Sequence, residues 1–250
     1  PEMSRGLGDV YKRQGDGSYC YPLTITDHFS RFIIGCEGMG AICDEAARDV
    51  CEEIFTTHGV PAVMHSDNGV PFACTGLAGL TKLSAYWLRL GITLERSRPA
   101  HPQDNGRHER MHRTLKAETT RPARDNLLQQ QERFDQFVEE FNTQRPHEAI
   151  DMKRPADVYV PSTKKHPTFL PDPDYSTYDD VLRVGTQGLI HLPGRRQVHL
   201  TKALAGHLVG IREESDDRWL VSFMHLDLGY VEPRCNRFTP ITWPSSPATT

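Results

Sequence analysis

Long apolar runs, cysteine pairs and a strong net charge are all missing from this chain of 250 residues. No stretch approaches the roughly twenty consecutive apolar residues of a transmembrane helix, and no signal peptide opens the sequence. Both absences predict a cytoplasmic protein that does not interact with a membrane. The six cysteines include no CxxC pair, which argues against a zinc knuckle and favours reduced thiols. The formal net charge of −4 gives no direct sign of a polyanionic partner.

Positive charge is nevertheless concentrated in one segment, residues 96–124. This segment carries eight Lys and Arg against three Asp and Glu, a local charge of 8 − 3 = +5. The acidic balance lies elsewhere, as in residues 132–140 and 172–180. A basic segment inside an acidic chain is the distribution that a nucleic-acid site needs, and a solvated helix face is the simpler alternative.

Strand and helix patterns alternate over the first 160 residues, which predicts an α/β domain. Apolar and β-branched runs predict strands at residues 19–26, 31–38, 61–66 and 92–95. Apolar residues at helical spacing predict helices at residues 42–58, 75–90 and 125–142. In the last of these helices Leu127, Phe134, Val138 and Phe141 form the expected core stripe.

The composition changes after residue 160, where prolines become frequent. Residues 161–178 are expected to form an extended connector. Five short β-rich runs follow, LIHL, QVHL, HLVGI, WLVSF and LGYV, and they predict a small SH3-like β-barrel at residues 179–243. Its basic residues are either phosphate contacts or solvated charges: Arg195, Arg196, Lys202 and Arg212. Residues 244–250 are predicted to be a disordered tail.

One carboxylate follows the strand predicted at residues 61–66. Asp67 begins the string DNG, which is typical of an Asx turn. A carboxylate at the end of a buried strand is also held on a rigid element while its oxygens stay accessible. Both interpretations of Asp67 remain open on the sequence alone.

A second carboxylate, Glu109, lies in a basic helix that begins after the turn residues Asn105 and Gly106. Cations recur around it every three residues, at Arg107, Arg110, Arg113 and Lys116. That spacing drifts slowly around a helix, so the cations make a broad basic face. A carboxylate in this setting predicts a hard metal ion close to a polyanion.

The same helix contains HERMH, which matches the HExxH pattern of zinc peptidases. In that alternative His108 and His112 bind zinc, His101 or His147 is the third ligand, and Glu109 is the general base. The helix is basic rather than apolar, and signals for peptide binding are absent. The zinc peptidase is therefore a minor alternative.

Four strings give the chain a resemblance to a known family. They are TDHFSRF at residues 26–32, HSDNGVPF at 65–72, HPQDNGRHERMHRTLK at 101–116 and FNTQRPHEAI at 141–150. With the order of the predicted elements, they resemble the ribonuclease-H-like core of DDE integrases and transposases, of the bacterial insertion-sequence type. The resemblance implies a mixed sheet flanked by helices at residues 15–160, a C-terminal barrel, and a homo-multimer that acts on transposon ends and target DNA.

The resemblance also implies roles for individual residues. Asp67 and Glu109, with 41 residues between them, occupy the places of the second and third catalytic carboxylates. Together with a first carboxylate they would hold two Mg²⁺ or Mn²⁺ ions for phosphodiester hydrolysis and strand transfer. Lys116 matches the basic residue that lies along the DNA end. The other cations of the helix, Arg107, Arg110 and Arg113, would hold the backbone.

The first catalytic carboxylate of the family has no match in this chain. Counting back from TDHFSRF places it near Leu7, inside residues 1–14, whose pattern predicts neither helix nor strand. Asp9 is the candidate nearest in number, and Asp27 is expected to be a turn residue. We therefore expect residues 1–14 to be a doubtful segment, the core to be truncated at its N-terminus, and the chain to be inactive as written. A catalytically dead DNA-binding remnant is the main alternative.

Overall fold

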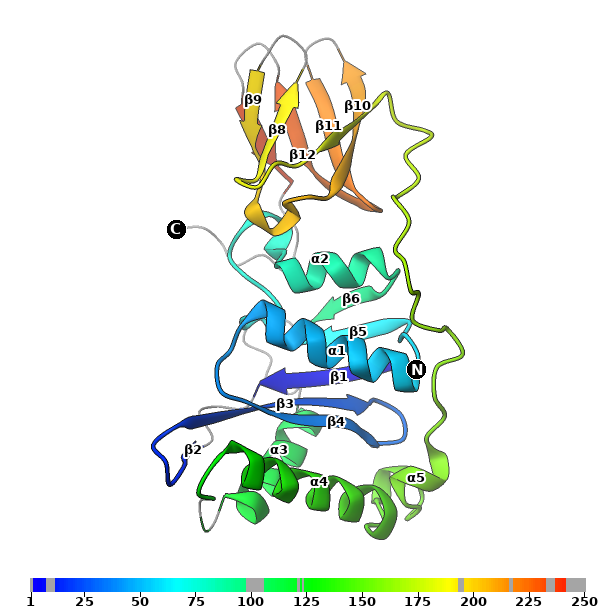
Figure 1. The fold of residues 1–250 in the computed structure, drawn as a ribbon. Helices are drawn as coiled ribbons and strands as arrows, with labels where there is room; N and C mark the ends of the chain where they lie inside the picture. The colour runs from blue at the N-terminus through cyan, green and yellow to red at the C-terminus, as the bar shows by residue number, and fades with distance from the viewer. Residues whose placement is uncertain are drawn as a thin grey trace. The chain divides into compact units, whose positions relative to one another are not determined.

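The computed structural model of the protein describes residues 2–7, 12–97, 106–120, 122, 124–192, 196–215, 218–232 and 237–241 (Figure 1). The chain divides into two compact units. Unit 1 comprises Pro1–Pro71 and Gly91–Pro167, and unit 2 comprises Phe72–Leu90 and Thr168–Thr250. The division after Pro167 falls inside the connector predicted at residues 161–178.

Unit 1 is built on a six-stranded mixed sheet in the order β2-β3-β1-β5-β6, with β4 paired to β3 (Figure 1). The strands are β1 (Glu2–Leu7), β2 (Lys12–Arg13), β3 (Tyr19–Asp27), β4 (Ile33–Met39), β5 (Val63–Ser66) and β6 (Thr93–Arg96). β1 is antiparallel to β3 and parallel to β5, and β5 is parallel to β6. The sequence pattern does not predict β1, because pairing on both of its sides defines this strand rather than an alternation of apolar residues.

Helices cover both faces of this sheet. α1 (Asp44–His58) approaches β4 closely at Gly35, where an added Cβ would lie 2.4 Å from Ile54 Cδ1. The neighbouring residue, Cys36, belongs to the opposite face, because successive strand residues point to opposite sides. There α3 (Gly106–Thr119) and α4 (Leu127–Gln144) pack on the sheet. Their shared core includes Ile33, Met111, Leu115, Phe134, Phe137 and Phe141, with Leu127 and Val138 at its margin, which confirms the predicted stripe of α4.

The edge strand β4 is covered by amide side chains of α4. Asn142 accepts a hydrogen bond from the Ile33 N–H through Oδ1 and donates one to the Ile33 carbonyl through Nδ2, both at 2.9 Å. Gln131 accepts from the Gly38 N–H at 2.8 Å and donates to the Cys36 carbonyl at 2.9 Å. These two side chains replace a neighbouring strand and satisfy backbone groups that would otherwise be exposed at the edge.

The helix predicted at residues 75–90 is wrong in its first half. A short 3-10 turn, η1 (Leu77–Gly79), contains Ala78 with φ 50°, and Leu80 is extended. The helix proper is α2 (Lys82–Arg89), which begins at a capping box between Thr81 and Ser84. The cap satisfies backbone groups at the helix start, so the apolar period upstream of Thr81 does not continue as helix.

Unit 2 contains a five-stranded antiparallel sheet in the order β13-β12-β11-β10-β7, and a separate pair, β8 and β9. The strands are β7 (Asp180–Arg183), β8 (Leu189–Leu192), β9 (Arg196–His199), β10 (Leu208–Ser215), β11 (Arg218–Phe223), β12 (Leu226–Glu232) and β13 (Arg237–Pro240). All five predicted β-rich runs lie in or overlap strands. The two sheets do not join into a closed barrel among the described residues, so the SH3-like barrel is not confirmed.

Other observations bear on the sequence predictions. None of the helices in the described part of the chain has the length and apolar character of a membrane span.

Five cysteines are free thiols: Cys20, Cys36, Cys43, Cys51 and Cys74. Cys235 and Arg195 lie outside the described residues. Arg212 Nη2 lies 3.6 Å from Glu214 Oε1 in an exposed ion pair of β10, which fits a solvated charge.

Candidate metal and nucleic-acid site

Asp67 follows directly after β5 and is half-buried. Its Oδ1 accepts a hydrogen bond from the Gly69 N–H at 3.0 Å, which is the geometry of an Asx turn. Asn68 Nδ2 donates to the Ser97 carbonyl at 2.8 Å, and the Ser97 N–H donates to the Ser66 carbonyl at 3.1 Å. These bonds tie the turn to the residue after β6. Asp67 therefore shapes a turn and is also held at the carboxyl end of two parallel strands.

The strand register relates Asp67 to β3. Arg5 of β1 pairs with Ser66 of β5 in the last pair of this parallel ladder, so Gly6 and Asp67 are the next residues on the two segments. Gly6 also pairs with Thr24 of β3. Residues in one row across a sheet project to the same face, and neighbouring strands lie about 4.8 Å apart. Asp67, at the end of β5, is therefore next in line with the row that contains Gly6 and Thr24.

α3 contacts the sheet at Thr24. His108 Nε2 lies 3.0 Å and His112 Nε2 2.5 Å from Thr24 Oγ1, and His108 Nδ1 lies 3.4 Å from Thr26 Oγ1. A hydroxyl donates only one hydrogen bond, so one of the two histidines must donate its Nε2 proton to Thr24. Glu109 lies between these histidines in sequence and is exposed to solvent. The helix that carries Glu109 is thus packed on the face of β3 that carries Thr24 and Thr26.

The same contacts bear on the zinc-peptidase alternative. Both HERMH histidines direct Nε2 at one threonine, His108 is 4% exposed, and the two rings are 4.6 Å apart between centroids. Among the described residues, no group of three His, Cys, Asp or Glu side chains could hold a metal ion. His101 lies outside those residues. The structure gives no support to a zinc peptidase.

Of the sequence candidates for the first carboxylate, the structure describes only Asp27. Asp9 lies outside the described residues, and Leu7 is opposite Leu23, one step from Thr24. Asp27 is 5% exposed, and its Oδ2 accepts hydrogen bonds from the Ser30 N–H at 2.7 Å and the Ser30 hydroxyl at 2.6 Å. Asp27 is thus the last residue of β3, and its side chain holds the turn that follows, as expected of a turn-forming residue.

The cations of α3 face solvent. Its buried residues are His108, Met111, Leu115 and Thr119. Its exposed residues include the predicted basic set, Arg107, Arg110, Arg113 and Lys116. The apolar side of the helix is thus bound to the sheet while the basic side remains available to a polyanion.

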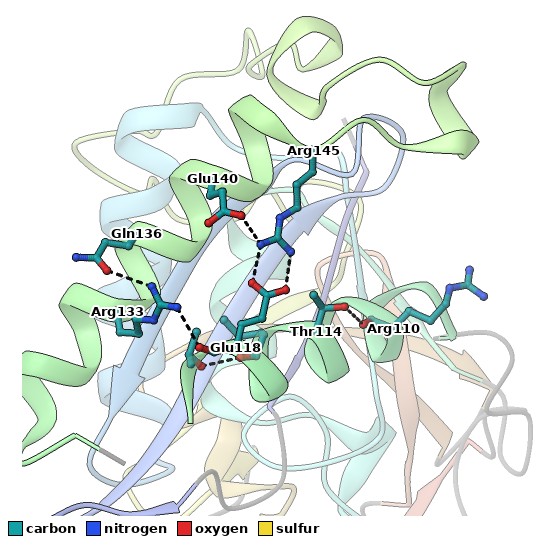
Figure 2. A network of polar contacts seen from close by, with 9 residues as sticks. Arg110, Thr114, Glu118, Arg133, Gln136, Glu140 and Arg145 are labelled. Carbon is teal, nitrogen blue, oxygen red and sulfur yellow. Dashed lines mark hydrogen bonds and ion pairs between the residues drawn. The ribbon is translucent and has the colours of Figure 1, made fainter. Parts of the chain in front are cut away.

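An ion-pair network fixes the end of α3 onto α4 (Figure 2). Arg145 binds Glu118 with two parallel hydrogen bonds, Nη1 to Oε1 at 2.8 Å and Nη2 to Oε2 at 2.6 Å, and also binds Glu140 at 2.7 Å. Arg133 Nη2 donates to the Glu118 carbonyl at 3.2 Å. The hydrogen bonds from Arg145 lower the pKa of Glu118, and those from Glu118 raise the pKa of Arg145. These contacts join the C-terminal end of α3 to α4.

The fold and these contacts define an integrase- or transposase-like core. Residues 90–155 match the family described as integrase core domain, a range that includes Glu109 and Lys116 but not Asp67. The chain is also similar to a Gag-Pol polyprotein of baboon endogenous virus, at 33% identity over 103 residues. That alignment covers 41% of this chain and 6% of the polyprotein.

A bacterial transposase and a solved viral intasome structure are also similar to this chain. The transposase for insertion sequence element IS904 of Lactococcus lactis is 28% identical over 156 residues, which are 60% of this chain and 59% of that protein. A simian T-cell lymphotropic virus intasome, solved in complex with PP2A regulatory subunit B56 gamma, has a TM-score of 0.52 at 13% identity. The similarity covers 90% of this chain and 77% of that one, and it concerns the fold. This chain therefore resembles polynucleotidyl transferases of the integrase and transposase class, and spans only part of the curated relatives.

Proposed function

We propose that this chain is the catalytic region of a DNA transposase or integrase, in which Asp67 and Glu109 are two of the carboxylates that bind a divalent metal. Two observations support the proposal: Asp67 follows the strand that pairs with β1, and α3 contacts β3 at Thr24, opposite Gly6 of β1. These observations support our proposal that two acidic residues far apart in sequence bind the same metal site. DNA is the proposed substrate, at transposon ends and at the target.

The two proposed carboxylate ligands suit a hard metal ion, but they are fewer than a site for two ions needs. Mg²⁺ prefers oxygen ligands and keeps several waters, so the half-buried Asp67 and the exposed Glu109 are suitable ligands. The row between them contributes Gly6, which has no oxygen-bearing side chain. Two carboxylates are enough for one ion with water, and they fall short of the three expected to hold two Mg²⁺ or Mn²⁺ ions. The metals would stabilise charge on the entering and leaving oxygens of the phosphodiester.

The remaining roles belong to side chains of this chain. Arg107, Arg110, Arg113 and Lys116 would bind the phosphate backbone and position the DNA without reading its sequence. On the analogy of the intasome, we propose that the chain acts as a homo-multimer. We also propose that residues 179–243 complete an SH3-like barrel, because β8 contacts β7 and β9 contacts β13. The boundaries at residues 15–160 and 161–178 remain predictions.

A noncatalytic DNA-binding protein is the second candidate. It is favoured by positions 6 and 7 of β1, Gly and Leu, neither of which can ligate a metal. Nicking of a supercoiled plasmid in Mg²⁺ separates the candidates. We expect the unaltered chain to bind the plasmid without nicking it, Gly6→Asp to nick it, and Glu109→Gln in that background to abolish nicking. Nicking that survives Glu109→Gln removes Glu109 from the mechanism, and a Gly6→Asp chain that binds without nicking favours the noncatalytic protein.

A further inference from the structure

A second feature of unit 1 lies outside the proposed metal ligands. A cavity of about 470 Å³ opens where three segments meet: the turn after β3, the first two turns of α3 and the turn after α4. That volume falls in the range of ordinary ligand sites. The lining includes Arg31 and His28 from the first segment, Arg107 and Arg110 from the second, and His147 from the third.

Most of the charged side chains that line this cavity are cationic. Burial, together with the positive charges of Arg107 and Arg110, lowers the pKa of Arg31, and Asp27 offsets this only in part. Asp27 already accepts two hydrogen bonds from Ser30. The other acidic residue of the lining, Glu148, is exposed. Arg107 and Arg110 thus each repel the Arg31 guanidinium, and an anion bound near Arg31 would relieve that repulsion.

Hydrogen bonds hold the cations in place. Arg107 Nη1 lies 2.8 Å from His28 Nε2, and Arg31 Nη1 donates to the His28 carbonyl. His108 is bound to Thr24 and Thr26, so it is already engaged with the sheet. Burial and the positive charges of Arg31 and Arg145 lower the pKa of His147, which keeps this ring neutral and leaves the guanidinium groups as the main cations. Arg31 arises from a different element than Arg107 and Arg110, so the site is formed only in the folded chain.

An exposed aromatic residue adjoins the lining residue His28 in sequence and suggests the source of the anion. Phe29 follows His28 in the turn after β3, and 73% of its surface is exposed. Exposed aromatic rings next to phosphate-binding cations are typical of sites for single-stranded nucleic acid, where bases stack on the ring. A free phosphate ion has no base that could stack on such a ring.

We propose that this cavity binds a backbone phosphate of a DNA strand through Arg31, Arg107 and Arg110, and that Phe29 stacks on a neighbouring unpaired base. The site rests on the proposed function in so far as DNA is the substrate. It adds a second place of contact, on the turn after β3, and a preference for an unpaired strand. The sequence predicted neither Arg31 nor Phe29 as a ligand, because Arg31 was expected to begin the strand at residues 31–38 and Phe29 to lie in the turn before it.

Fluorescence anisotropy of the full chain with a labelled single strand and with the matching duplex tests this site, in buffer without divalent metal. Arg31→Gln should weaken single-strand binding about tenfold and reduce the salt slope by about 0.7. Phe29→Ala should weaken binding of the single strand at least fivefold and change binding of the duplex less than about twofold. Arg48→Gln, on the exposed side of α1, removes the same charge and should change neither more than about twofold.

Several results would overturn the site. One is an Arg31→Gln chain that binds DNA like Arg48→Gln, and another is equal loss of single-strand and duplex binding in Phe29→Ala. If Arg31→Gln shows a lowered melting temperature, Arg107→Gln, on the exposed side of α3, replaces it with the same expectation. Binding of millimolar inorganic phosphate that depends on Arg31, with DNA binding unchanged, would assign the cavity to a free anion. Because metal is absent, these outcomes are independent of the nicking that tests Asp67 and Glu109.

Discussion

Gly6 of β1 stands directly opposite Thr24 of β3 in the antiparallel ladder. The parallel ladder to β5 ends at Arg5 and Ser66, so the same glycine and Asp67 are the next residues on the two segments. Counting along the sequence places the missing carboxylate one residue later, at Leu7, which is opposite the buried Leu23. The register and the count therefore assign the first carboxylate to different residues.

This disagreement gives a paired test of the register. Because alternate strand residues face opposite sides of a sheet, only Gly6→Asp should bring a carboxylate to the face of Asp67. We expect Gly6→Asp to increase Mn²⁺ affinity about tenfold or more and Leu7→Asp to leave it unchanged, as measured by calorimetric titration. An increase with Leu7→Asp alone would mean that the sequence count, and not the ladder, identifies the position.

Loss of the Asn142 amide should destabilise unit 1 strongly. Asn142→Leu leaves the N–H and carbonyl of Ile33 without their partners at a buried edge, and each unsatisfied group costs about 1 to 3 kcal/mol. Urea unfolding should show a loss of about 3 kcal/mol. Gln136→Leu, on the exposed side of the same helix, should change the free energy of unfolding by about 0.5 kcal/mol or less. Equal effects of the two substitutions would mean that Asn142 does not hold β4.

The ion pair of Glu118 with Arg145 should make stability depend on pH. Since the folded state lowers the pKa of Glu118, the pair stabilises the fold at neutral pH, and this contribution is lost as the pH falls through the lowered pKa. Glu118→Gln should cost about 0.5 to 1 kcal/mol at pH 7, because the pair is partly exposed and screened. The difference from the unaltered chain should shrink in acid. Glu139→Gln, an exposed residue of α4, is the control, and a difference that persists in acid would contradict an ionic origin.

Lys116 should contribute to DNA affinity through charge alone. Lys116→Ala should weaken binding to every duplex sequence alike and reduce the salt slope by about 0.9, the value for one phosphate contact. Anisotropy titrations between about 50 and 200 mM salt measure the slope. Lys165→Ala, which removes an exposed charge outside α3, should leave it unchanged. An unaltered slope in Lys116→Ala would exclude the phosphate contact.

Strong local patterns predicted much of the fold. The apolar stripe of α4 and the β-rich runs of unit 2 have their own periods, so they are visible in isolation. β1 cannot be recognised from its own sequence, EMSRGL, because this segment forms a strand through its pairing with β3 and β5. The break before α2 depends on hydrogen bonds between Thr81 and Ser84, which the apolar spacing of residues 75–90 does not reveal.

The candidate site was predictable only as separate pieces. Short strings singled out Asp67 and Glu109. Their proposed proximity depends on the register of β1 with β3 and β5, and on the contact of His108 with Thr24. The cavity at Arg31 requires the turns after β3 and α4 to meet α3, and these segments are far apart in sequence. The spacing of residues within one helix or strand does not reveal that these three segments lie together in the folded chain.

Mn²⁺ binding by the unaltered chain, by Asp67→Asn, by Glu109→Gln and by the double variant tests the central claim most directly. If both carboxylates hold one ion, each single substitution should weaken binding about tenfold or more, and the double variant should lose little beyond either single one. Calorimetric titration or electron paramagnetic resonance measures the four affinities. Losses that simply multiply in the double variant, or single variants that bind Mn²⁺ like the unaltered chain, would contradict a shared metal site.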